Sequence, residues 1–139
     1  MRIAQYCLAV AASAALCGMS LGIYMAANQD FTLAPAHAHL NLLGWVSMAL
    51  YGLWYRGAEI ARPRLAWTQA IVATVGFAIM VVALALLLAT GEHRFEALIG
   101  VGAIFTVLGM LLFLFQILTD GRAVAAGRPG PAWAVNREV

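Results

Sequence analysis

The sequence predicts an all-α integral membrane protein, a bundle of four transmembrane helices with both termini on the cytoplasmic side. Three observations lead to this fold class. Of the 139 residues, 64% are hydrophobic and only 10% are charged, whereas soluble domains carry roughly a quarter charged residues. Four predominantly apolar stretches are each long enough to cross a bilayer. The few arginines lie between these stretches and near the termini, which is typical of membrane orientation rather than of nucleic-acid binding.

The first helix is expected over residues 3–27. This apolar run is longer than the roughly 7–15 residues of a signal-peptide hydrophobic region, so we interpret it as a membrane span. Ala14, Gly18 and Gly22 recur every four residues along it. A stripe of small residues allows another helix to approach closely, and we expect it to pack against a helix of its own or another chain. We also expect a homo-oligomer or a subunit of a respiratory complex.

Three further helices are expected over residues 33–55, 65–89 and 95–118. Pro35 falls in the first turn of the second helix, where proline is tolerated. Together the four helices form the predicted transmembrane domain, residues 1–121. The remaining residues, 122–139, include a glycine- and proline-rich run that cannot hold regular structure, so we expect a flexible cytoplasmic tail.

The distribution of arginine predicts the orientation. Arg2, the segment from Arg56 to Arg64 and the arginines of the tail fall on one side of the predicted bundle, whereas residues 28–35 contain no basic residue. By the positive-inside rule both termini are cytoplasmic. We therefore expect a multi-pass protein of a bacterial-type inner membrane, in contact with the lipid bilayer. The scarcity of ionisable side chains within the spans argues against a proton pump or an ion transporter.

The candidate site is the start of residues 36–56, AHAHLNLLGWVSMALYGLWYR. Neutral imidazole is a good ligand for heme iron, copper or zinc, and a polar ring at the edge of an apolar span is a functional candidate. Residues two apart on an α-helix point about 200° away from each other, so His37 and His39 are expected to face different partners. His37 shares its expected face with Asn41 and Trp45. The alternative is that both rings lie among lipid headgroups, hydrogen-bonded to lipid or loop carbonyls.

This stretch resembles the tenth transmembrane helix of subunit I in the heme-copper oxidase superfamily, in particular in C-family cytochrome c oxidases and nitric oxide reductases. The shared features are the Ala-His-x-His opening, Leu-Gly-Trp-Val four residues after the second histidine, and the aromatic end. In that family the first histidine is the proximal ligand of the high-spin heme and the second ligates the low-spin heme. The resemblance implies that His37 binds one heme and His39 another. It implies one or two b-type hemes and a role in respiratory electron transfer, or in binding oxygen or nitric oxide.

The family's copper centre needs three further histidines, which the predicted spans lack. Whether the chain is an oxidoreductase therefore stays open. His93, in the expected hairpin before the fourth helix, is either a solvated loop residue or a further ligand at the outer surface. Two alternatives to heme binding are kept: a cofactor-free accessory or assembly subunit of a respiratory membrane complex, and an outer-face copper site using His37, His39 or His93 with Met25.

Overall fold

The computed structural model describes residues 2–58 and 60–125, and every regular element within them is helical. All four predicted helices are present. The elements, in order, are α1 (Ile3–Asn28), α2 (Ala34–His39), the π-helix η1 (Leu40–Ser47), α3 (Met48–Gly57), α4 (Pro63–Thr90), the 3₁₀ turn η2 (His93–Phe95) and α5 (Glu96–Ala125).

The second predicted helix corresponds to α2, η1 and α3, which follow one another without a break. The fourth runs beyond its expected end at residue 118. Residues 122–125 of the predicted tail therefore belong to α5, and the rest of the tail lies outside the described residues.

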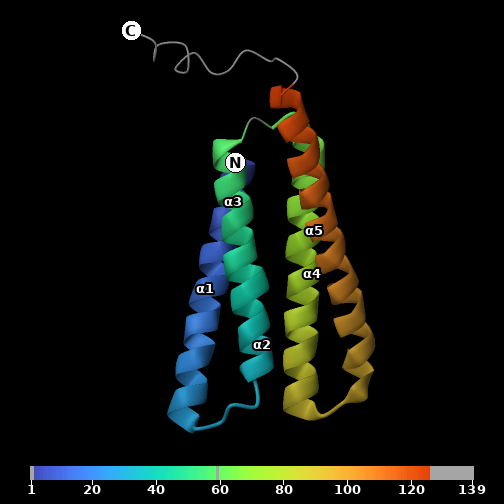
Figure 1. Cartoon of the computed structure of the whole chain (residues 1–139). Helices are drawn as coiled ribbons and strands as arrows, with labels where there is room; N and C mark the ends of the chain where they lie inside the picture. The colour runs from blue at the N-terminus through green and yellow to red at the C-terminus, as the bar shows by residue number, and fades with distance from the viewer. Residues whose placement is uncertain (1, 59, 126–139) are drawn as a thin grey trace.

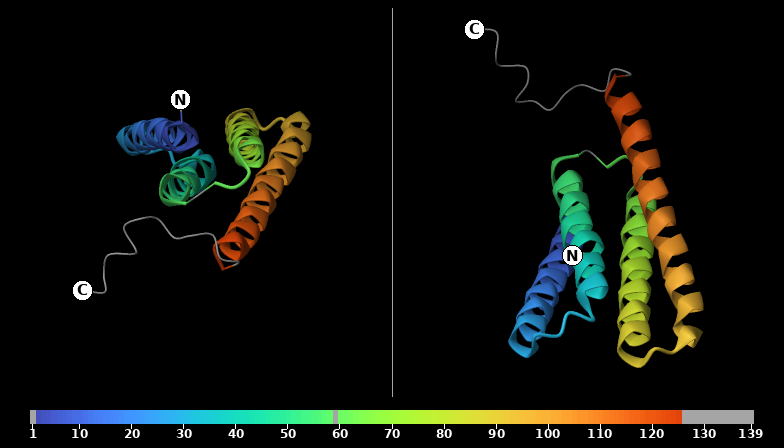
Figure 2. Two further views of the ribbon diagram at one scale, coloured as in Figure 1. Left: turned by 90° about the horizontal axis from the view of Figure 1, so that it is seen from above. Right: turned by 60° about the horizontal axis from the view of Figure 1, so that its bottom comes forward.

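The helices run antiparallel in succession and form two neighbouring hairpins (Figure 1). In the first, α1 packs against η1 and α3; in the second, α4 packs against α5. The start of α1, the end of α3, the start of α4 and the end of α5 lie at one end of the bundle, and the other views agree (Figure 2). We call this the arginine end, because Arg2, Arg56 and Arg62 lie there. The opposite end, where α2 begins and η2 lies, carries all three histidines, and we call it the histidine end.

Glycines bring α4 and α5 into close contact. A β-carbon at Gly76 would lie 2.6 Å from the backbone nitrogen of Thr106, and one at Gly102 would lie 2.6 Å from the backbone nitrogen of Met80. Main-chain atoms of packed helices cannot move aside without separating the helices, so these two positions accept only glycine. Gly100 differs, because a β-carbon there would meet no atom within 4 Å.

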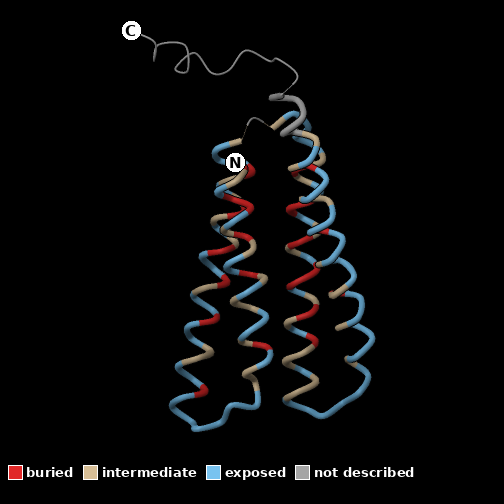
Figure 3. Tube along the Cα trace, in the orientation of Figure 1, coloured by how far each residue is buried: buried red, intermediate tan, exposed pale blue. Residues whose placement is uncertain are grey.

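A large apolar surface is exposed along the outer helices, most of all on α5 (Figure 3). Three helical stretches are long and apolar enough to cross a membrane, namely Ile3–Asn28, Pro63–Thr90 and His93–Thr119. The structure is therefore consistent with a multi-pass membrane protein, in agreement with the coarse fold class that the sequence predicts.

A buried polar cluster joins three helices near the arginine end. The hydroxyl of Tyr55 donates to Oε1 of Gln69 at 2.8 Å, and Nε2 of Gln116 donates to the same hydroxyl at 3.1 Å. Both glutamines are almost wholly buried, at 0% and 1% exposed. The cluster therefore links α3, α4 and α5, while Nε2 of Gln69 is buried without a hydrogen-bond partner among the described residues. Tyr55 itself is only 5% exposed and faces inward.

Candidate functional site

His37 belongs to α2. Its side chain faces α1 and is half-buried. Its ring covers Gly22, where a β-carbon would lie 3.2 Å from Cε1 of the imidazole. Asn41, one turn further on, covers Gly18, where a β-carbon would lie 2.6 Å from Oδ1 of the amide. Nδ2 of Asn41 donates to the carbonyl oxygen of His37 at 2.9 Å and lies 3.2 Å from Nε2 of its ring. His37 and Asn41 therefore lie on the same face of the second helix, as their spacing predicts, and this face contacts α1.

This contact identifies the partner of the stripe of small residues on α1. Gly18 and Gly22 meet Asn41 and His37 of the same chain, and a β-carbon at Gly44 would lie 2.9 Å from Cβ of Ala14. The close approach that the stripe predicts is thus realised within the chain. This face of α1 is therefore covered by the second helix of the same chain.

His39 has different surroundings. It is exposed, and its Nδ1 lies 2.8 Å from the carbonyl oxygen of Pro35, one turn earlier in α2. A carbonyl only accepts hydrogen bonds, so Nδ1 carries the hydrogen and donates it. The neutral ring then keeps its lone pair on Nε2. One histidine is thus held in a helix contact and the other presents a free ligand atom, in keeping with two separate faces.

Trp45 does not lie with His37 and Asn41 in the contact with α1. It is 47% exposed, whereas its neighbour Gly44 is buried. The physical reason is η1, whose hydrogen bonds span five residues instead of four; Oγ of Ser47 also donates to the carbonyl oxygen of Leu42 at 2.9 Å. Residues spaced four apart therefore do not stay on one face of the helix through this segment. The structure places Trp45 at the outer surface of the second helix.

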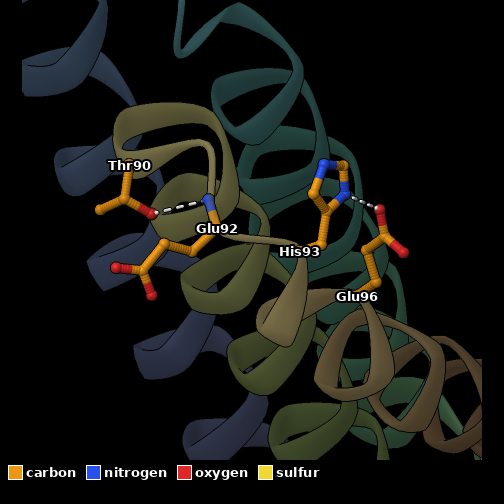
Figure 4. Close-up of polar contacts among 4 residues, drawn as sticks. All are labelled: Thr90, Glu92, His93 and Glu96. Atoms are coloured by element: carbon orange, nitrogen blue, oxygen red, sulfur yellow. Dashed lines mark hydrogen bonds and ion pairs between the residues drawn. The ribbon is translucent and has the colours of Figure 1, made fainter.

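His93 lies on η2, in the connection between α4 and α5 (Figure 4). Its side chain is 85% exposed, and its Nδ1 lies 2.8 Å from Oε1 of Glu96, with which it forms an ion pair when protonated. The neighbouring Arg94 forms an ion pair with Glu92, and the backbone nitrogen of Glu92 donates to the hydroxyl of Thr90 at 3.3 Å. These contacts fit a solvated connection.

The described residues fit one part of the predicted heme site. Metal-binding histidines usually donate their second ring hydrogen to a carbonyl or carboxylate, as His39 does to Pro35, so His39 has the arrangement of an axial ligand. His37 is less accessible because its ring is packed against Gly22 and Asn41.

Over residues 2–58 and 60–125, no three His, Cys, Asp or Glu side chains form a group that could hold a metal ion. Met25, the methionine of the copper alternative, is buried in α1. The family's heme-copper centre, which needs three further histidines, has no counterpart among these residues. Comparison of the chain with protein-family models, with curated proteins and with solved structures found no match.

Proposed function

We propose that the chain is a membrane protein with four spans that binds heme b at the histidine end, with His39 as an axial ligand. The observation that carries this proposal is the 2.8 Å hydrogen bond from Nδ1 of His39 to the carbonyl oxygen of Pro35. It orients an exposed imidazole and leaves its Nε2 available to iron. The resemblance of residues 36–56 to the His-x-His helix of heme-copper oxidases supports the same assignment.

The fourth span in this proposal is the segment formed by α2, η1 and α3. These elements contribute 6, 8 and 10 residues in direct succession, which together meet the roughly 20 residues that a span requires. The segment is uncharged until Arg56 near its end. Four spans also place the start of the first helix and the end of the last helix on the same side of the membrane, as the arginine distribution predicts.

Bound heme would supply one-electron transfer or the binding of a diatomic gas. The chain itself would hold the imidazole of His39 in place and keep the apolar faces of the bundle in lipid. Both roles suit a component of respiratory electron transfer or a gas-binding protein. Because the further histidines of the heme-copper centre are missing, the proposal does not include reduction of oxygen or nitric oxide by this chain alone.

The visible absorption spectrum of the full chain, purified in detergent, tests the proposal. We expect a Soret band, sharpened bands after reduction with dithionite, and heme b in a pyridine hemochrome assay. Copper in metal analysis without a Soret band would overturn the heme assignment in favour of the copper-binding alternative. Neither heme nor copper in protein purified from heme-supplemented cells would overturn it in favour of the accessory subunit.

The orientation gives a second prediction. In a background with Cys7→Ala and Cys17→Ala, which removes both native thiols, a single cysteine is introduced either at Asn28 or at Ala58. A membrane-impermeant maleimide added to intact cells should label the Asn28 position, at the histidine end, and not the Ala58 position, at the arginine end. Permeabilised cells, in which both positions should react, provide the control. Labelling of Ala58 alone in intact cells would reverse the proposed orientation.

A further inference from the structure

A recess of about 650 Å³ opens at the arginine end, between the first turn of α1 and the end of α3. Its polar wall contains Arg2, Gln5 and Arg56, and its apolar wall includes Leu8 and Ile60. Among the described residues that line it there is no carboxylate. The recess therefore combines two guanidinium groups with a hydrocarbon surface.

Neither guanidinium is neutralised within the described part of the chain. The ion pairs found there are His93 with Glu96 and Arg94 with Glu92, both at the histidine end. Arg62, by contrast, lies over the ring of Phe115, 5.5 Å from its centroid. Arg2 and Arg56 thus contribute two positive charges to one recess, and none of the described residues that line it is an anion.

The first turn of α1 adds to this positive field. Ile3 and Ala4 line the recess, and the first amide N–H groups of a helix have no partner within it. The backbone nitrogen of Arg2 is already used, since it donates to Oε1 of Gln5 at 3.1 Å. Helix N-termini favour negatively charged groups, so the amides and the two arginines act in the same direction.

We propose that this recess binds the phosphate of an anionic phospholipid headgroup, with Arg2 and Arg56 as its ligands. Guanidinium groups suit phosphate because they form paired hydrogen bonds with its oxygens. The apolar wall, with Leu8 and Ile60, distinguishes a lipid from free phosphate, because it offers a surface to the glycerol and the first acyl carbons. Basic recesses between helices at the cytoplasmic surface are the usual places for such headgroups.

This inference depends on the membrane part of the proposed function and not on heme. The full chain in neutral detergent is titrated with dioctanoyl phosphatidylglycerol, dioctanoyl phosphatidylcholine or inorganic phosphate, and bound molecules are counted by native mass spectrometry. We expect phosphatidylglycerol to bind about tenfold more tightly than phosphatidylcholine. Arg56→Gln should abolish that preference, Arg2→Gln should reduce it severalfold, and Arg56→Lys should retain much of it.

Arg62→Gln is the matched control, because it removes an arginine at the same end of the bundle but outside the recess. It should leave the preference unchanged, and circular dichroism should show the same helix content in all variants. Three results would overturn the lipid site. They are equal binding of the two lipids, an equal loss of the phosphatidylglycerol preference in Arg62→Gln, and tight binding of inorganic phosphate in place of lipid. Extraction of the protein from membranes by alkaline carbonate would instead overturn the membrane assignment and the lipid site with it. Absence of heme would leave the lipid result intact.

Discussion

Replacement of His39 by alanine is expected to remove at least half of the bound heme, and replacement of both His37 and His39 nearly all of it. The reason is that Nε2 of His39 is the exposed ligand atom, whereas the ring of His37 is packed against Gly22 and Asn41. If the protein holds one heme, His39→Ala alone should suffice and His37→Ala should have little effect. If it holds two, each single variant should lose about half.

The measurement is heme per protein from the pyridine hemochrome assay, with the spin state read from the visible bands. Loss of an axial imidazole changes the ligand field of the iron, so residual heme should also show an altered spectrum. His93→Ala is the control, since this histidine is exposed and paired with Glu96, and it should keep the full heme content. Full absorbance in the double variant would exclude both histidines as ligands.

Replacement of Gly76 by alanine is expected to cause a large loss of stability for the addition of a single methyl group. The added β-carbon would lie 2.6 Å from the backbone nitrogen of Thr106 and 2.9 Å from the carbonyl carbon of Phe105. Since both are main-chain atoms, α4 and α5 must move apart. Overpacking of this kind costs about 1–3 kcal/mol, and we expect the upper part of that range.

Gly100→Ala is the matched control on the neighbouring helix, because a β-carbon there meets nothing within 4 Å. Alanine is favoured over glycine in helices by up to about 1 kcal/mol, so this variant should be as stable as the parent or slightly more so. Unfolding of both variants by SDS in mixed micelles, followed by circular dichroism, measures the difference. Equal stability of the two variants would show that α4 and α5 are not in the close contact described.

The sequence is sufficient to predict the positions of the helices. Long apolar runs interrupted by arginine, glycine and proline define their approximate limits, because only helices satisfy their backbone hydrogen bonds within one apolar segment. The extension of α5 to Ala125 was not predicted, since a helix end that is not forced by proline depends on contacts that hydropathy does not describe.

The candidate site was predicted only in part. The contact of His37 with Asn41 follows from their four-residue spacing. The partner of the small-residue stripe could not be predicted, because spacing alone cannot distinguish a helix of the same chain from a helix of another chain. The position of Trp45 depends on η1, for which the sequence contains no clear signal. The inward direction of Tyr55 depends on Gln69 and Gln116, which are distant in sequence and adjacent only after folding.

The π-helix η1 also constrains the length of the second helix. A turn closed by hydrogen bonds over five residues holds one residue more than an α-turn, so η1 is equivalent to an insertion that the fold has retained. If the same residues formed a regular α-helix throughout, this extra residue would rotate everything before it by about 100° relative to everything after it. His37 and Asn41 could then not face α1 while Tyr55 still faced Gln69. A one-residue deletion within η1, for example of Leu42, should therefore be tolerated better than one within α2 or α3, where a deletion rotates the two contacts apart.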